Sequence, residues 1–556
     1  MTATLVNLRL PKEDFSTQVA GHFTSREKLH DWLISQPHAQ PLDLSRNLHD
    51  ALFTLNRTKV DRDLRLQLNE LFLQSVNMHL PALQLIYKST TVTNNPRASS
   101  AWKFARDLFI ELGFAFKLSL VEETTRRFGM SDRQTARLIA RILDLEQRLL
   151  ILCYQAYYPL PEGIWLDCHT LFYFALQHKL FDELPKEEPL QIVPLYKETL
   201  LLGLCDPYSL LHGEIEQVRD WLQKLANHAI LQSVEELFDP SGFFLIKLDE
   251  DNAPQFMGQR PQELTGHHTL LLNCFDLVRR MYRELAPLEK VAASSNTYYR
   301  ATQHIDLLRR LIRSWGIAPK RVFNRMRNDA TVILVSELST VHRVLTSSRV
   351  EPATSPSASV DFDDISDVIP DFMPSPSPGS IAVSEETHSL WKVINVSAGG
   401  YALQLISEDI GLISVGRIVI LKSDTGDKWN VAAVRWVRLE DHVEIGLQLL
   451  APEAETIMIR PVIHATGTPF EPGLLLPAVQ ELRQPASILA PAGFFAPLRE
   501  FEILRGPYTL TVRSVRRMTQ GLCVDQFEFI TPAEVEALME MPYFDSDANS
   551  MSHRVA

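Results

Sequence analysis

The spacing of apolar residues changes abruptly after Gly316, and this change divides the 556-residue chain into two kinds of structure. Between about residues 47 and 315 the apolar residues recur every three or four positions, which is the period of amphipathic helices. Gly316 and Pro319 then end the last long helix, because glycine favours a helix C-cap and proline cannot continue the hydrogen-bond ladder. We therefore expect an all-α helical array over residues 1–316.

Short β-branched runs follow this break and predict two small all-β units. The runs that indicate the first unit lie at residues 330–335, 393–394, 401–405, 417–421, 431–437 and 443–449. Runs of five to seven residues separated by Gly, Asp and Ser turns are typical of a small antiparallel barrel. We place this barrel at residues 317–462. A further all-β domain is expected at 463–545, and the last residues, 546–556, read as a frayed tail.

A segment rich in Pro, Ser and Asp interrupts the first barrel at about residues 350–385. This composition buries too little apolar surface to fold alone, so we expect a disordered insertion. Within it, residues 360–373 mix acidic and apolar side chains. That mixture is compatible with a peptide that docks on a partner and with a solvated linker.

The overall composition limits the classes of function. A net charge of −13 repels polyanions on average, so an anionic ligand needs a local basic site. No apolar run approaches the ~18 residues of a membrane span, and no secretory signal is recognisable, which favours a cytoplasmic protein. Five scattered cysteines predict reduced, mostly buried thiols, with no disulfide framework.

Basic residues gather between the helices and the first barrel. Residues 279–327 hold twelve Lys and Arg and three Asp and Glu, and twelve minus three gives nine net positive charges. This local reversal of charge indicates an anionic ligand or a nucleic acid. The alternative is a solvated helix face whose charges are paired elsewhere in the chain.

Two short motifs carry the polar and positively charged side chains that are candidates for a binding site. Arg321 and Arg325 stand four apart just before the first predicted strand, with Arg327 and Lys320 beside them. A planar guanidinium can donate two hydrogen bonds to O6 and N7 of guanine, and it can also stack on a purine or neutralise a phosphate.

The second motif is Asn395-Val396-Ser397-Ala398-Gly399-Gly400, in which an amide and a hydroxyl two residues apart face the same side of a strand. Gly400 allows a positive φ or a close approach of the ligand.

Together these motifs resemble the two halves of a PilZ domain, a small β-barrel that binds cyclic di-GMP. The R-x-x-x-R segment leads into the first strand, and the [DN]-x-S-x-x-G segment lies on a later one. The resemblance covers about residues 318–460. It implies that Arg321, Arg325, Arg327, Asn395, Ser397 and Gly400 bind cyclic di-GMP, and that a bacterial receptor of this kind controls motility, attachment or exopolysaccharide.

Other signals support an enzyme or a metal protein poorly. The sequence holds no P-loop, dinucleotide fingerprint, G-x-S-x-G or H-E-x-x-H motif, so we expect no enzyme and no cofactor. Asp167-Cys168-His169 offers side chains of the type that bind metals, but its neighbours are typical of a core helix.

We expect a receptor that relays cyclic di-GMP to a protein partner through the helical domain. The alternatives are a ligand-independent adaptor and a protein that binds single-stranded RNA through residues 279–327.

Overall fold

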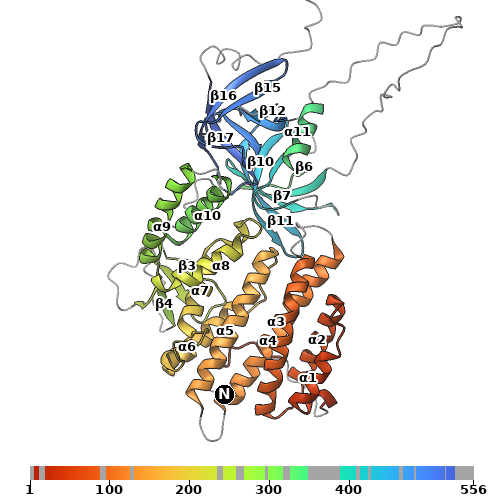
Figure 1. Cartoon of the computed structure of the whole chain (residues 1–556), viewed down its shortest axis with the longest axis vertical. Helices are drawn as coiled ribbons and strands as arrows, with labels where there is room; N and C mark the ends of the chain where they lie inside the picture. Colours follow the sequence, from red (N-terminus) through yellow and green to blue (C-terminus); the bar gives the residue numbers. More distant parts are fainter. Residues whose placement is uncertain are drawn as a thin grey trace, which may run out of the picture.

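The computed structural model describes most of the chain and places the helical region and the barrels at opposite ends of an elongated molecule (Figure 1). The described residues are 5–11, 19–87, 95–125, 130–234, 242–257, 268–294, 298–316, 326–348, 388–407, 413–423, 428–462, 468–480, 484–519 and 521–531. The predicted insertion at 350–385 and the predicted tail at 546–556 lie outside them. Within these ranges, no helix is both long enough and apolar enough to cross a bilayer.

The N-terminal region is built from antiparallel helices, as the periodicity predicts. The longer helices are α1 (Arg26–Ile34), α2 (Pro41–Asn56), α3 (Arg62–Tyr87), α4 (Pro96–Thr124), α5 (Asp132–Gln155), α6 (Ile164–Gln177), α7 (Ile192–Leu204), α8 (Glu214–Leu225), α9 (Phe275–Ser294) and α10 (Tyr298–Gly316). The hydroxyl of Ser131 accepts a hydrogen bond from the Gln134 amide and caps α5. α10 ends at Gly316, where the sequence predicts a stop.

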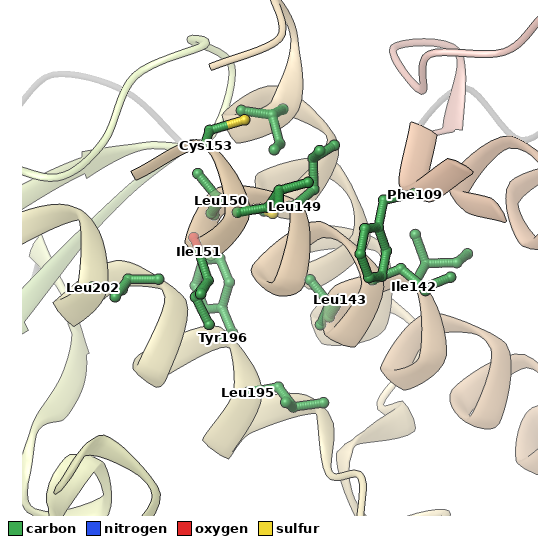
Figure 2. Close-up of a cluster of buried hydrophobic side chains, with 14 of the residues drawn as sticks. Phe109, Ile142, Leu143, Leu149, Leu150, Ile151, Cys153, Leu195, Tyr196 and Leu202 are labelled. Atoms are coloured by element: carbon green, nitrogen blue, oxygen red, sulfur yellow. The ribbon is translucent and has the colours of Figure 1, made fainter. Parts of the chain in front are cut away.

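The core of this region forms where α5 packs between α4 and α7. Phe109 of α4, Leu143 and Leu150 of α5, and Tyr196 of α7 are all buried there (Figure 2). Apolar side chains cover several faces of α5, so it is the central helix of the array. Cys153, at its end, is buried in the same cluster.

A buried ion network crosses this core. Lys117 of α4 lies 2.6 Å from Glu146 of α5 and 2.6 Å from Asp167 of α6, and its side chain is only 1% exposed. Arg9 joins both carboxylates from the rim, at 3.1 Å from Glu146 and 2.5 Å from Asp167. Two cations thus balance two carboxylates, which makes burial of all four groups tolerable.

Replacing Lys117 with methionine keeps the apolar volume and removes one charge from this network. We expect Lys117→Met to destabilise the helical region by about 3–5 kcal/mol, because Glu146 and Asp167 are then buried with one cation fewer. Urea unfolding followed by circular dichroism measures the change. Lys103→Met on the exposed side of α4 is the matched control. Equal unfolding midpoints for the two variants would contradict this account.

A small sheet interrupts the helices and was not expected from the sequence. Its order is β1 (Ile230–Ser233), β4 (Thr269–Asn273), β2 (Phe244–Lys247) and β3 (Gln255–Phe256), and all its pairings are antiparallel. The strands are two to five residues long, too short for an alternating pattern to stand out between longer helices.

The middle barrel forms from the runs that predicted it. Its strands are β6 (Thr331–Ser336), β7 (Ser389–Ser397), β8 (Gly400–Leu405), β9 (Ile418–Ser423), β10 (Asn430–Leu439) and β11 (Val443–Ala451). They follow the order β7-β6-β9-β10-β11-β8, and pairing of β7 with β8 closes the ring. Trp391, Leu403 and Ile445 are fully buried inside it.

A second closed barrel follows, with strands in the order β12-β13-β14-β17-β16-β15. The strands are β12 (Glu455–Pro461), β13 (Glu471–Leu476), β14 (Ser487–Pro491), β15 (Glu500–Arg505), β16 (Tyr508–Arg517) and β17 (Val524–Ile530). The helix α11 (Leu338–Ser347), which the sequence analysis did not predict, lies between the barrels and shares one hydrophobic cluster with both. The two barrels therefore pack as one body around α11.

One end of the middle barrel rests on the helical region. Tyr157, just after α5, is buried in the barrel's own hydrophobic cluster. Its carbonyl accepts a hydrogen bond of 2.8 Å from the Leu439 amide, and its hydroxyl donates to the Leu210 carbonyl at 2.9 Å. Helical region and barrel thus share buried residues across their boundary.

Candidate nucleotide site

The described part of the site begins where a two-residue strand, β5 (Met326–Arg327), pairs with β7. In this antiparallel register Met326 lies opposite Val396, and Arg327 lies opposite Asn395. Residues directly opposite in such a pair have Cβ atoms about 5 Å apart. The pairing therefore joins the end of the arginine motif to the strand that carries the asparagine and serine motif.

Asn395 and Ser397 both face away from the barrel interior. All three residues are half-buried, and Val396, between the other two, packs against the interior cluster. Successive side chains alternate across a strand, so the amide and the hydroxyl share the outer face. The sequence analysis predicted this shared face.

A two-residue turn, Ala398-Gly399, joins β7 to β8 and brings Ser397 opposite Gly400. The Ser397 hydroxyl lies 3.4 Å from the Gly400 carbonyl oxygen, to which it donates a long hydrogen bond. A ligand acceptor that approaches from outside can compete for this donor, because so long a bond is weak.

Gly400 is required by a close approach of two strands. A methyl group at this position would stand 1.9 Å from the Leu447 carbonyl oxygen of β11, and φ is +155°. No side chain fits there without movement of the backbone. The glycine thus serves the barrel itself, in addition to any approach of a ligand.

We expect Gly400→Ala to destabilise the middle barrel by at least about 2 kcal/mol, because the added methyl overlaps fixed backbone. Thermal unfolding and limited proteolysis of the full chain measure the effect. Gly21→Ala is the control, since a methyl there meets no atom within 4 Å. A melting temperature unchanged from that of the parent would be inconsistent with the observed packing of β8 on β11.

Arg321 and Arg325 lie outside the described residues, which resume at Met326. The segment that carries them connects Gly316 at the end of α10 to β5. The structure therefore fixes both ends of the arginine segment, one on a helix of the N-terminal region and the other on the barrel beside Asn395.

The outer face continues beyond the predicted residues onto β11 and β10. Gln448 of β11 lies directly opposite Gly400, and its Oε1 accepts a hydrogen bond of 2.7 Å from Nε of Arg435 on β10. Burial, followed by the positive charges of Arg310 and Arg313 on α10, lowers the pKa of Arg435 to about 10. Sequence reasoning missed both residues. The available signal was a single arginine within an otherwise apolar stretch of β10.

Three arginines of the basic run at residues 279–327 are paired with carboxylates. Among the described residues the pairs are Arg280 with Glu284 at 3.4 Å, Arg309 with Glu289 at 2.6 Å, and Arg310 with Glu214. These three arginines agree with the alternative of a paired, solvated helix face.

The Asp167-Cys168-His169 cluster belongs to the helical core. Asp167 binds Lys117 and Arg9, as described above. His169 contacts the Tyr196 hydroxyl at 2.8 Å and the Asn252 carbonyl oxygen at 2.9 Å, and burial lowers its pKa to about 4. Asp167 and His169 are thus held by ion pairs and hydrogen bonds within the helical core.

Comparisons with known proteins match all three parts of the chain in order. Residues 27–236 match the model described as the N-terminal domain of the cyclic-di-GMP receptor FimW. The middle PilZ domain of that receptor matches residues 243–351 and 376–456, and the FimW C-terminal β-barrel domain matches residues 457–531.

A curated protein of Pseudomonas aeruginosa, named the cyclic-di-GMP receptor FimW, is similar over nearly the whole chain. It is 25% identical over 565 aligned residues, which cover 92% of this chain and 91% of that protein. The three domain matches and this full-length similarity agree with the barrels seen in the structure. The chain therefore belongs to the FimW family, and its middle barrel is a PilZ domain.

Proposed function

We propose that this protein is a receptor for cyclic di-GMP, which binds on the outer face of the PilZ barrel where β5, β7 and β8 meet. The observation that carries the proposal is the register of β5 on β7, with Arg327 opposite Asn395. The relative from Pseudomonas aeruginosa is named a receptor for the same nucleotide, which supports the proposal.

Each element of this face suits one part of the ligand. Arg321 and Arg325 donate paired hydrogen bonds to O6 and N7 of guanine, or stack on its ring. Asn395 and Ser397 offer an amide and a hydroxyl to a second edge of a base. Arg327 supplies positive charge to a phosphate. Together these groups make the site locally positive, whereas the overall charge of −13 repels an anionic nucleotide.

Binding is converted into a signal by the connection between α10 and β5. The arginine segment is tied to both, so a ligand that orders it changes the preferred position of α10 relative to the barrel. Such a shift requires different affinities for the two arrangements. We infer that the helical region then binds a protein partner, and that the output concerns motility, attachment or exopolysaccharide.

Calorimetric titration of cyclic di-GMP into the full-length protein tests the proposal. We expect micromolar or tighter binding by the parent. Arg321→Ala and Arg325→Ala should each weaken it tenfold or more, because each removes hydrogen bonds from a charged group, worth about 1.5–3 kcal/mol. Ser397→Ala should weaken it by up to about tenfold, because it removes a neutral hydrogen bond worth about 0.5–1.5 kcal/mol.

Arg460→Ala on the second barrel is the control and should bind as the parent does, since Arg460 is paired with Glu502 away from this face. Absence of binding by the folded parent would overturn the receptor proposal and favour a PilZ barrel used as a ligand-independent adaptor.

A further inference from the structure

An open groove lies on the middle barrel, at the end of β7 away from the candidate nucleotide site. Leu390 lines this groove, and Asn395 of the nucleotide site lies five residues further along β7, or about 17 Å at about 3.3 Å per residue. The groove has a volume of about 420 Å³, and its lining residues are Ile333 of β6, Ser389 and Leu390 of β7, Lys422 of β9, His388 and Trp429. A volume in the range of about 300–1,000 Å³ is typical of small-ligand sites, so the groove can hold a few side chains of a peptide.

The groove combines apolar side chains with a positive charge. Ile333, Leu390 and Trp429 supply the apolar surface, and the Lys422 ammonium lies 5.0 Å from the centre of the Trp429 ring. Burial, followed by the positive charge of Lys422, lowers the pKa of His388, which places that ring within the field of the lysine. A ligand that suits this surface carries aromatic or aliphatic side chains next to carboxylates.

Both ends of the sequence insertion lie beside this groove. The described chain stops at Ser348, directly after α11, and resumes at His388, which lines the groove. Residues of α11 share a hydrophobic cluster with Trp429, and Ile333 packs against the same cluster. Residues 349–387 therefore leave the barrel and rejoin it next to the groove.

Residues 360–373 of this insertion have a composition that complements the groove. They hold five aspartates and no lysine or arginine, and their apolar members are Val360, Phe362, Ile365, Val368, Ile369, Phe372 and Met373. Carboxylates are attracted to Lys422, and aromatic and aliphatic side chains can pack on Trp429 and Leu390.

The segment is also long enough and close enough to reach the groove within one chain. Fourteen residues, 374–387, separate Met373 from His388. A chain of that length spans at most about 50 Å when fully extended. Because the far end of this tether is a lining residue of the groove, the segment can fold back onto it.

We propose that residues 360–373 dock in the groove lined by Ile333, Leu390, Lys422 and Trp429 on the middle barrel of the same chain. The tether gives the segment an effective concentration on the order of 1 mM at the groove, so even a weak contact is occupied most of the time. Of the two interpretations that the composition left open, the proposal favours a docking peptide over a solvated linker, and the surface on which it docks belongs to its own chain. The proposal does not depend on nucleotide binding.

A fluorescently labelled peptide of residues 360–373 tests the proposal, with binding to full-length proteins followed by fluorescence anisotropy. In the double variant Phe362→Ser with Phe372→Ser, the tethered segment loses both aromatic side chains and leaves the groove open. We expect this variant to bind the free peptide about tenfold more tightly than the parent, since a tethered competitor at about 1 mM weakens a Kd of about 100 µM by that factor. Val383→Ser, in the same insertion but outside the segment, is the matched control and should bind the peptide like the parent.

A substitution in the groove locates the binding. Lys422→Glu, added to the double variant, should weaken peptide binding about tenfold or more, because a carboxylate then faces the aspartates of the peptide. Lys392→Glu on the same background is the control, since Lys392 is an exposed lysine of β7 that does not line the groove and pairs with Asp329 at 3.0 Å. It should leave the affinity for the peptide nearly unchanged.

Several results would overturn the proposal. Equal peptide binding by the parent and the double variant would mean that the segment does not occupy the groove, and so would a lack of binding by the folded double variant. Equal losses in Lys422→Glu and Lys392→Glu would reduce the contact to general charge attraction. Tighter peptide binding by Val383→Ser would assign the groove to the residues next to β7. Self-association of the parent that the double variant lacks, measured by sedimentation, would assign the segment to a second copy of the chain.

Discussion

The anchoring of α10 is the constraint on which the architecture depends. Trp315, in its last turn, is buried in the helical core and donates a hydrogen bond of 3.0 Å to the Leu201 carbonyl. Asp306, on the same helix, pairs with Arg517 of the second barrel at 2.5 Å. Arg310 pairs with α8 and packs against Gly521. One helix thus contacts the helical region and the second barrel before the chain enters the arginine segment of the middle barrel.

In the proposed relay, this arrangement connects the nucleotide site to the helical region. Asp306 and Arg517 are almost fully buried, and burial raises the pKa of Asp306 while the positive charge of Arg517 opposes that shift. Breaking such a pair leaves an uncompensated buried charge, so a change in the position of α10 relative to the second barrel has to work against this contact. The middle barrel and the second barrel share a hydrophobic cluster through α11. The two barrels therefore form one body. A ligand that moves the arginine segment changes the position of α10 relative to this body.

Much of this fold could be predicted from the sequence, and the misses have physical causes. Strands β6 to β11 follow from short β-branched runs because each has one face in the barrel interior. The helix α11 is short and lies between a strand and the insertion, so its periodicity does not stand out in the sequence. The strands β1 to β4 are also short, and longer helices flank them on both sides. The asparagine and serine motif predicted the shared outer face, since Asn395 and Ser397 flank an inward-facing residue, whereas Arg321 and Arg325 lie outside the described residues.

The surroundings of Arg435 could not be predicted in this way. Arg435 becomes part of the outer face only through the register of β10, β11 and β8, and a sequence alone does not give that register. Its nearness to Arg310 and Arg313 depends on how α10 packs on the barrels. Contacts between distant segments are decided by tertiary packing, whereas motifs that span four to six residues are visible in the chain itself.

Hydrogen exchange of the full-length protein, with and without saturating cyclic di-GMP, tests the central claim most directly. The account predicts slower exchange in peptides from residues 300–330, which contain most of α10, the arginine segment and β5, and a smaller slowing in Ser397→Ala at a ligand concentration that just saturates the parent. Calorimetric binding by the parent with identical exchange in these peptides would contradict it. In that case the ligand binds the barrel without any effect on α10.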